Sequence, residues 1–466
     1  MAWPSMAWPL TAWPYKAWPW KVWPEPRRPA RLAPPHRSGR SVTMGALGVT
    51  PHLATWGIAA LATLGVILRP LGWPEAVWAV LGAIVLVALG LLPAGTAWDG
   101  VLKGTDVYLF LIGMMLLAEV ARKEGLFDWL AGIAVRRARG SATRLFTLVY
   151  AVGTVVTVFL SNDACAVVLT PAVACAAKAA RVRDPLPYLL VCAFIANAAS
   201  FVLPISNPAN LVVYAAHMPP LAEWLARFTL PSALAILATY AALRLTQGPT
   251  LRAQEVATDV PRADLSRTGL VAGLGILATG LVLIAASARG LALGPPTCLA
   301  GLATALLVLA LRREGLAELV RDVSWSVLPL VAGLFVLVEA LERTGVLRLV
   351  ADTLRVQAGA HPAGTAWGAG ALVALLCNLL NNLPAGLIAG AAVQAAEVSD
   401  RIAGAILIGV DLGPNLSVTG SLATILWLTA IRREGQHVGA WRFLALGALV
   451  MPPALLLALA GLLLVP

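Results

Sequence analysis

The sequence predicts an all-α polytopic membrane protein built from two inverted repeats, each with a re-entrant helical hairpin and a broken transmembrane helix. Three observations predict this fold class: an apolar composition, apolar runs of membrane-spanning length and an internal repeat. Of the 466 residues, 59% are hydrophobic and only 12% are charged, whereas about a quarter of the residues of soluble domains are charged. The recurring apolar runs of about 17–25 residues match the length that an α-helix needs to cross about 30 Å of hydrocarbon. The strands of a β-barrel are shorter and alternate in polarity, which excludes that class.

The apolar runs place the expected helices along the chain. They cover residues 53–69, 74–93, 106–121, a pair within 143–178, 187–214, 228–245, 268–288, 295–311, 325–341, a pair within 363–397, 402–430 and 443–465.

Residues 1–43 form a tail of different composition. The tail repeats "AWP" or close variants, as in "MAWPSMAWPLTAWPYKAWPWKVWPEP", and then becomes rich in arginine and proline. Such a composition forms neither a helix nor a packed core, so we expect a disordered segment. The alternative is that Met44 is the biological start and that the repeat is an upstream extension.

The remaining chain divides into three parts. The segment 246–267, "TQGPTLRAQEVATDVPRADLSR", is the only long polar stretch inside it. We therefore expect a first transmembrane repeat at residues 44–245, a cytoplasmic linker at 246–267 and a second transmembrane repeat at 268–466.

The two halves share an internal sequence repeat. "LIGMMLLAEVARKEGLFDWLA", from residue 111, matches "VAGLFVLVEALERTGVLRLVA", from residue 331, at an offset of about 220 residues, as in proteins with repeated structural units. The same offset pairs Asn162 in "FLSNDACAVVLTP" with Asn382 in "LLNNLPAG". Each half is therefore expected to contain the same polar interruption.

Loop charges predict the orientation of these interruptions. Arginines precede the pair of helices within 143–178 and basic residues follow it, so the positive-inside rule places both ends in the cytoplasm. The roughly 33 residues between Arg144 and Lys178 are few for two crossings and a turn, which predicts a re-entrant hairpin with "SND" near its tip. The basic segments 312–315 and 431–442 place the ends of the second hairpin outside. The two repeats are thus predicted to be inverted copies.

The charge and cysteine content exclude several other classes. The formal net charge of +11 comes from the tail and from the surplus typical of cytoplasmic loops, so nucleic-acid binding is not needed to explain it. Five cysteines lie singly in apolar segments, which predicts neither a disulfide framework nor a zinc site. No lysine stands in a G-K-[ST] context, so ATP hydrolysis is not expected of this chain. We expect no enzyme activity, cofactor or metal site.

Two further polar stretches interrupt expected helices. "FIANAASFVLPISNPANL" (194–211) and "GVDLGPNLSVTGSLATIL" (409–426) each place Asn, Ser, Gly and Pro in the middle of a span. Broken helices of inverted repeats are where many secondary transporters bind substrate and coupling ions, near the membrane midplane. We therefore expect four polar interruptions to converge.

Three motifs carry a resemblance to a known family. "LSNDACAVVLTP", "NLLNNLPAGLIAG" and especially "ILIGVDLGPNLSVTGSLATILWL" resemble the signatures of the arsenical pump membrane protein (ArsB) family of the ion transporter superfamily. The resemblance runs from about residue 50 to 465 and implies efflux of arsenite or antimonite across the plasma (inner) membrane, driven by the proton gradient. In some systems a separate soluble, arsenite-stimulated ATPase subunit takes part. This sequence departs from the family at Asn197, where an aspartate is usual.

Asp163 and Asp411 are the ionisable residues at the expected interruptions. A carboxyl group within a membrane can be charged or protonated according to its solvation, as a proton-coupled cycle requires. The alternative is that each aspartate caps the start of a half-helix. Glu119 and Glu339 form a repeat-related pair, but they lie near helix ends, where an interfacial role is expected.

Amides and hydroxyls are the candidate substrate ligands. Arsenite near neutral pH is mainly As(OH)₃, an uncharged solute whose hydroxyls suit groups that donate and accept hydrogen bonds. The alternative is that these amides only satisfy the broken backbone. Cys165 and Cys377 are expected to pack as small apolar residues, because a carrier must release arsenic that three thiolates would hold. The predicted ligands are Asn162, Asn197, Ser206, Asn207, Asn210, Asn381, Asn382, Asn415, Ser417, Thr419 and Ser421.

The sequence favours a proton-coupled exporter of trivalent metalloid hydroxides. A sodium/proton antiporter or a dicarboxylate carrier of the same superfamily is the main alternative, although no Arg or Lys lies within the four interruptions to bind a dicarboxylate. A membrane scaffold without transport activity would not explain repeat-related polar breaks.

Overall fold

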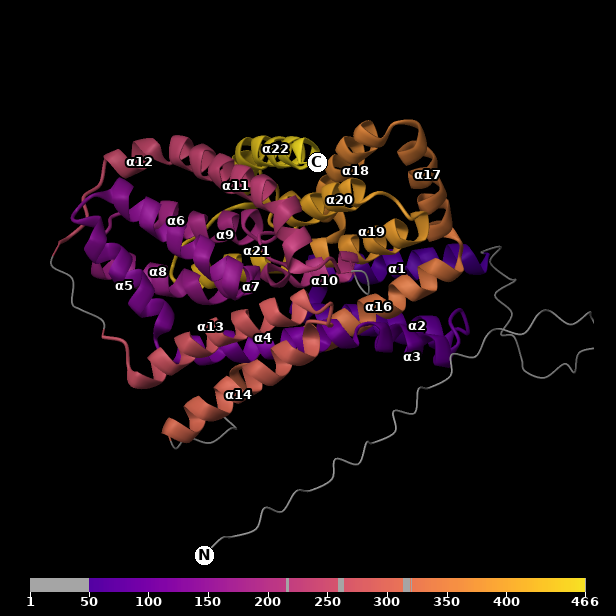
Figure 1. The fold of residues 1–466 in the computed structure, drawn as a ribbon, viewed down its shortest axis with the longest axis horizontal. Helices are drawn as coiled ribbons and strands as arrows, with labels where there is room; N and C mark the ends of the chain where they lie inside the picture. Colours follow the sequence, from indigo (N-terminus) through magenta and orange to yellow (C-terminus); the bar gives the residue numbers. More distant parts are fainter. Residues whose placement is uncertain (1–49, 215–217, 259–263, 313–318, 320, 466) are drawn as a thin grey trace, which may run out of the picture. The chain divides into compact units, whose positions relative to one another are not determined.

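The computed structural model describes residues 50–214, 218–258, 264–312, 319 and 321–465. All regular elements within these ranges are helices (Figure 1), which confirms the all-α prediction. The described residues belong to one compact unit. The expected disorder of residues 1–43 lies outside the described residues.

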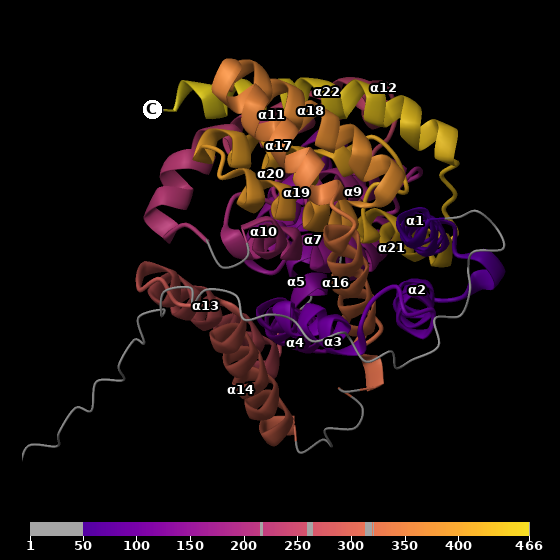
Figure 2. The same cartoon turned by 90° about the vertical axis from the view of Figure 1, so that its right-hand side faces the viewer.

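The helices pack in two layers, the lower and the upper layer of Figures 1 and 2. The lower layer contains η2 (Pro70–Gly72), α2 (Glu75–Ala88), α3 (Ala94–Lys103), α4 (Thr105–Lys123), α13 (Arg267–Ala288), α14 (Gly294–Arg312) and α16 (Val327–Arg343). Helix α1 (Pro51–Leu68) packs mainly on α2 and lies above it in Figure 2, at the height of α21. The upper layer takes from the first half α5 (Leu126–Ala138), α6 (Ala142–Phe159), α7 (Asn162–Ala164), the π-helix η3 (Cys165–Leu169), α8 (Thr170–Ala179), α9 (Leu186–Ala198), η4 (Pro204–Ser206), α10 (Pro208–Tyr214), α11 (Leu221–Thr246) and α12 (Gly248–Arg252). From the second half it takes α17 (Val346–Ala360), α18 (Pro362–Leu380), α19 (Asn382–Ala396), α20 (Asp400–Leu412), η6 (Gly413–Asn415), α21 (Leu422–Arg433) and α22 (Ala440–Leu464).

Seven of the described helices are long and apolar enough to cross a membrane, and the bent pair α3–α4 adds an eighth candidate. The pair bends by 48° at Gly104, a feature that the apolar pattern does not predict. The absence of a Cβ atom at Gly104 lets the Tyr108 and Phe335 rings pack against the bend. The protein is therefore a multi-pass membrane protein.

The same order of elements occurs in both halves. A membrane-length helix, a second limb, a short helix, an unwound segment and a further helix follow one another in α6–α11 and again in α18–α22. Helices of one half also pack against helices of the other half. In the lower layer α4 packs on α14 and α16 packs on α2; in the upper layer α10 packs on α19, and α21 packs on α7, η3 and α8. The inversion of one half relative to the other stays a prediction.

The apolar-run criterion misses α5 and α17. Both are amphipathic helices with charged residues on the exposed face, so their polarity hides them among the expected loops. Each begins after a glycine in the left-handed region, Gly125 (φ 70°) and Gly345 (φ 82°), where L-residues are strained. These glycines are 220 residues apart, at the offset of the repeat.

Both expected pairs of helices turn at the predicted tips. Ser161 (φ 147°) separates α6 from α7, and Asn381 (φ 71°) separates α18 from α19. Each side chain caps the following helix: Ser161 Oγ accepts from the Ala164 N–H (3.3 Å) and Asn381 Oδ1 from the Leu383 N–H (3.4 Å). Since α6 and α18 are themselves long enough to span, the re-entrant character of these hairpins stays a prediction.

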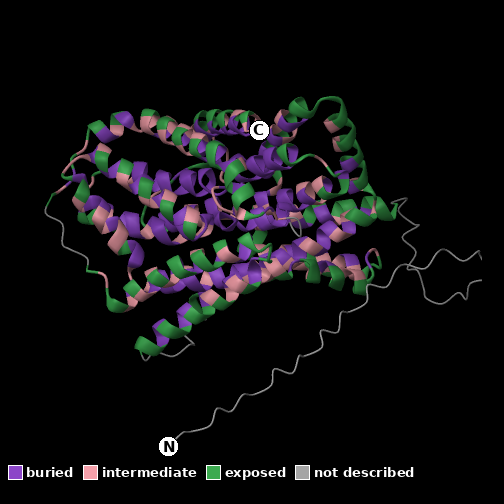
Figure 3. Cartoon of the chain, in the orientation of Figure 1, coloured by how far each residue is buried: buried purple, intermediate pink, exposed green. Residues whose placement is uncertain are grey.

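Both expected broken helices are interrupted as predicted. The first consists of α9, η4 and α10, and the second of α20, η6 and α21. Every residue of α9 is buried, and Figure 3 shows the buried residues running through the centre of the upper layer. The expected linker contains the helix α12, and within it Gln254 Oε1 accepts a hydrogen bond from the backbone N–H of Asp184 (3.1 Å).

Candidate functional site

The two broken helices meet inside the upper layer. The penultimate residues of α9 and α20 are Asn197 and Asp411, and both side chains are fully buried, at 0% exposure. A buried polar group without a hydrogen bond costs about 1–3 kcal/mol. The partners of these two side chains therefore define the candidate site.

Asp411 contacts the interruption of the first repeat. Nδ2 of Asn207 donates a hydrogen bond to Asp411 Oδ1, and Ser200 is the second polar side chain beside the carboxyl group. Asn207 Oδ1 accepts from the Ala209 N–H (3.0 Å), which fixes the orientation of the amide. Asp411 Oδ2 has no hydrogen-bond partner within the described residues. The ion pairs between described side chains do not include Asp411.

Asn197 contacts the interruption of the second repeat. Its Nδ2 donates to Asn415 Oδ1 (3.0 Å) and to Thr424 Oγ1 (3.4 Å), and its Oδ1 accepts from Ser421 Oγ (3.4 Å). The backbone carbonyl of Asn197 accepts from Ser200 Oγ (2.8 Å). Ser200 thereby joins the Asn197 network to the Asp411 network, and together they form the polar centre.

Asn210 and Ser206 hold the first interruption in shape. Asn210 Nδ2 donates to three carbonyl oxygens of residues 200–204 at 2.9–3.3 Å, while its Oδ1 has no partner within the described residues. Ser206 Oγ donates to the Val158 carbonyl of α6 (2.9 Å). These contacts fit the alternative that amides and hydroxyls satisfy the hydrogen bonds of the unwound backbone. Of these two side chains, only the Oδ1 atom of Asn210 remains as an acceptor without a described partner.

The tip of the second hairpin forms a separate polar group around Asn378. Asn378 Oδ1 accepts from Ser417 Oγ (2.7 Å), and its carbonyl accepts from Thr419 Oγ1 (2.9 Å). Asn381 Nδ2 donates to the Thr419 carbonyl (3.4 Å), and the Asn382 N–H donates to the carbonyl of residue 420 (2.8 Å). Four predicted ligands thus meet at the loop between η6 and α21.

The tip of the first hairpin bonds within itself. Asn162 Oδ1 accepts from the Asp163 N–H (2.9 Å), and Asn162 is buried whereas Asp163 is half-buried. The tip packs against α9 and α21. It is followed by η3, a π-helix, a rare distortion that is frequent at functional sites.

Neither aspartate caps a half-helix. Asp411 lies at the C-terminal end of α20 rather than at a helix start. Asp163 lies in the first turn of α7, but Ser161 is the residue that caps this turn. The capping alternative therefore fails for both.

The thiols and the two repeat-related glutamates take structural positions. Cys165 Sγ lies 3.5 Å from the Cys192 carbonyl, and Cys377 Sγ lies 3.8 Å from the Val410 carbonyl, so both thiols pack against backbone. Glu119 pairs with Arg122 and Glu339 with Lys103, near the ends of α4 and α16. Within the described residues, no group of three or more His, Cys, Asp or Glu side chains could hold a metal ion.

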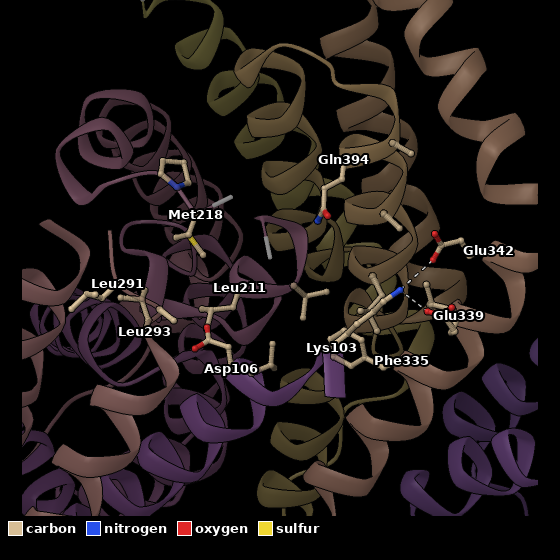
Figure 4. A pocket seen from close by; sticks show the side chains of 18 of the residues that line it. Lys103, Asp106, Leu211, Met218, Leu291, Leu293, Phe335, Glu339, Glu342 and Gln394 are labelled. Carbon is tan, nitrogen blue, oxygen red and sulfur yellow. Dashed lines mark hydrogen bonds and ion pairs between the residues drawn. The ribbon is translucent and has the colours of Figure 1, made fainter. Parts of the chain in front are cut away.

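A cavity of about 910 Å³ lies between the two layers (Figure 4). From the lower layer, Lys103 lies 2.6 Å from Glu339 and 3.6 Å from Glu342 at its edge. From the upper layer, Leu211 and Leu387 line it. Leu211 follows Asn210 directly in α10, and Leu387 follows the second hairpin tip in α19. No residue of the polar centre or of the group around Asn378 lines the cavity; where α10 and α19 face it, its wall includes the apolar side chains Leu211 and Leu387.

Sequence reasoning missed three members of these networks: Ser200, Asn378 and Thr424. Ser200 and Thr424 lie inside the interrupted stretches. Because several other polar residues lie there too, the sequence does not indicate which hydroxyl groups join the networks. Asn378 precedes the hairpin tip by one helical turn, and only its contact with Ser417 (2.7 Å) reveals its place.

Paired broken helices with buried amides, hydroxyls and a carboxyl, set among membrane-length helices, define a membrane transporter. The comparisons agree with this class. The profile of the citrate transporter family, CitMHS, matches residues 61–432. The chain belongs to this family.

Curated relatives support the same class, and a solved structure has a similar fold. An arsenical pump membrane protein of Escherichia coli is 27% identical over 429 residues, covering 88% of this chain and 98% of the relative. An uncharacterized transporter of Mycobacterium bovis is 27% identical over 369 residues, covering 76% and 84%. The YdaH transporter of Alcanivorax borkumensis has a similar fold, with a TM-score of 0.53 and 17% identity over 88% of this chain and 96% of that chain.

Proposed function

We propose that this protein exports arsenite and antimonite, as trivalent metalloid hydroxides, across the plasma membrane in exchange for protons. The observation that carries the proposal is Asp411, a fully buried carboxyl group within a network of neutral donors and acceptors and without a described cation partner. An ionisable group of this kind inside a membrane is a functional candidate, because it can bind and release a proton during the cycle.

The chemistry of the polar centre favours an uncharged, hydroxyl-bearing substrate. Its side chains are amides, hydroxyls and one carboxyl, which donate and accept hydrogen bonds but offer no positive charge. A citrate or dicarboxylate anion would need cationic partners to offset its desolvation. The names of the arsenical pump relatives support the same choice among solutes.

The contacts between the layers suit a movement of one layer against the other. Each ion pair between described side chains joins elements of the same layer, as in Lys103–Glu339 below and Arg227–Asp400 above. Contacts across the boundary, such as α4 with α10 and α16 with α19, surround the cavity between Leu211, Leu387 and the lower layer. Sliding of apolar surfaces breaks no described ion pair, so the hairpin-bearing upper layer is the part that we propose moves.

Proton binding and substrate binding are coupled at Asp411 in this scheme. A proton that enters from outside neutralises the carboxyl, and substrate release to the outside accompanies that step. Return of the upper layer then carries the proton inward. A soluble arsenite-stimulated ATPase subunit stays a prediction from the resemblance, and the cycle described here does not require it.

Uptake into everted membrane vesicles tests the proposal. Vesicles with and without the protein are given an imposed pH gradient, acid inside, and are offered arsenite, antimonite, sodium or citrate. We expect gradient-dependent uptake of arsenite and antimonite. Sodium movement without metalloid movement would instead identify a sodium/proton antiporter, and citrate movement an organic-anion carrier.

A further inference from the structure

Asn197 and Asp411 occupy equivalent positions in the two halves. α9 (Leu186–Ala198) and α20 (Asp400–Leu412) are both 13 residues long, and each side chain belongs to the penultimate residue. Each helix is followed by an unwound segment with a short 3₁₀ turn, η4 or η6. Both side chains are 0% exposed.

Each of the two side chains forms hydrogen bonds with residues of the opposite half of the chain. Asn197, in the first half, bonds to Ser421, the residue that caps α21 in the second half. Asp411, in the second half, bonds to Asn207, the residue before α10 in the first half. Each side chain therefore joins the end of one broken helix to the restart of the other.

The two positions differ in chemistry and in hydrogen bonding. Both polar atoms of the Asn197 side chain have partners, with Asn415, Thr424 and Ser421 at 3.0–3.4 Å. Asp411 keeps one bonded oxygen, and its Oδ2 has no partner within the described residues. One position is neutral and satisfied, whereas the other can accept a proton.

Few other titratable groups face these positions. Asp163 on α7, which packs on α9 and α21, is half-buried, and no described hydrogen bond or ion pair joins its side chain to Asn197 or Asp411. Cys377 on α18 is the titratable side chain whose electrostatic interaction with Asp411 is described. Cys192 lies on α9 and Cys165 on η3, both fully buried, and their thiols contact backbone carbonyls rather than Asn197. The charged residues of the helices packed on α9 and α20, such as Lys178, Arg401 and Arg432, lie at helix ends.

We propose that residue 197 determines how many protons are exchanged in each transport cycle. The amide of Asn197 keeps the first of two equivalent positions permanently neutral, so that of these two positions only Asp411 carries a proton. This inference rests on the proposed function, since it concerns the coupling step of that same site.

The surroundings of Asn197 suit a carboxyl group. A protonated aspartate at this position donates one hydrogen bond from its O–H, which replaces the bond from Asn197 Nδ2 to Asn415 Oδ1. Its other oxygen accepts from Ser421 Oγ as the amide oxygen does. After loss of the proton, the donor to Asn415 is gone and two acceptors face each other, so the contact responds to protonation.

Reconstituted protein with Asn197→Asp tests the proposal. At zero membrane potential, we would find the pH gradient that just balances a fixed arsenite gradient, which gives the number of protons exchanged per arsenite. We expect the N197D variant to exchange about one proton more than the wild type, because it adds one titratable group to the cycle. A folded, active N197D protein with an unchanged ratio would overturn the proposal.

The double variant separates this proposal from the proposed function. D411N should lose proton-driven transport, and N197D/D411N should regain it through the carboxyl in the first half. N378D/D411N, which places the new carboxyl elsewhere in the upper layer, is the matched control and should not regain proton-driven transport. If transport by D411N remains proton-driven, the proposed coupling role of Asp411 is wrong. If D411N loses proton-driven transport and the double variant N197D/D411N does not regain it, only the proposed role of residue 197 is wrong.

A measurement on the wild type covers the case in which N197D does not fold. The ratio of the unmodified protein should equal about one proton for each neutral arsenite, as expected for a single titratable group. A ratio of about two would contradict a permanently neutral first position.

Discussion

The carboxyl groups of Glu339 and Asp411 have opposite surroundings: Glu339 pairs with the cation Lys103, whereas Asp411 has no described cationic partner. Glu339 lies near the end of α16, with its side chain 12% exposed, and Lys103 is 2.6 Å away. Asp411 is 0% exposed and has only neutral partners within the described residues. A paired carboxylate at a helix end stabilises a fixed contact, whereas a buried, unpaired one can change its charge state. The difference points to Asp411, and not to the glutamates, as the coupling group.

Removal of the Asp411 carboxyl should have the largest effect on transport. Asp411→Asn keeps the shape and the contact with Asn207 but cannot bind a proton reversibly. We expect proton-driven arsenite uptake to fall at least about 100-fold, the scale on which loss of a proton-transfer group acts. Arsenite exchange without a pH gradient should persist, and equal loss of both activities would mean that D411N damages the fold instead.

The close packing of the second hairpin on α10 gives the next largest effect. A Cβ atom at Gly390 would lie 2.9 Å from the Val212 carbonyl oxygen and 2.9 Å from Val213 Cα. Gly390→Ala should therefore destabilise the protein by about 1–3 kcal/mol through overpacking. Thermal unfolding in detergent measures this.

Gly368 provides the matched control for Gly390. It lies in α18 with nothing within 4 Å of an added Cβ. Gly368→Ala should leave stability unchanged or raise it by up to about 1 kcal/mol, as expected for alanine in a helix. Equal effects at the two glycines would contradict the close contact between α19 and α10.

Loss of the Lys103–Glu339 pair should have a small effect. Because the Lys103 side chain is 55% exposed, Lys103→Met should cost no more than about 1 kcal/mol. Proton-to-arsenite coupling should stay at the wild-type value, measured in the same proteoliposomes as D411N. A changed number of protons per arsenite in K103M would instead indicate that the coupling group lies at the edge of the cavity and not in the upper layer.

The thiols should have the smallest effect on transport. Cys377→Ala removes a buried sulfur that packs on the Val410 carbonyl, so we expect a stability loss of about 1 kcal/mol from the small cavity. Arsenite affinity should remain within about twofold, since thiolate capture is not the proposed binding mode. A much larger loss of affinity, with antimonite affected alike, would show that sulfur binds the metalloid.

The sequence predicted the features that depend on local polarity. The interruptions at 194–211 and 409–426 and the hairpin tips at Ser161 and Asn381 follow from polar residues and prolines inside apolar runs, and the structure contains each of them. Membership of a transporter family was also evident from the motifs. The amphipathic helices α5 and α17 and the bend at Gly104 were missed, because they depend on packing rather than on mean polarity.

The sequence could not predict how the polar residues are shared between networks. The expectation placed all four interruptions around one pocket. In the structure, Asn197 and Asp411 lie in one joined centre, Asn381 and Asn382 lie beside Asn378, and the first hairpin tip bonds within itself. Such pairings depend on how helices far apart in the sequence cross. The equivalence of Asn197 and Asp411 was hidden for the same reason, since their offset differs from that of the hairpins.

Proton movement driven by arsenite tests the central claim most directly. Proteoliposomes containing the wild type or D411N would enclose a pH-sensitive dye and be given an arsenite gradient at zero membrane potential. The account predicts that arsenite movement in one direction drives proton movement in the other in the wild type, and that this proton movement is absent in D411N. Arsenite transport by the wild type without proton movement, or equal proton movement in both proteins, would contradict the claim that the buried Asp411 carboxyl couples the two.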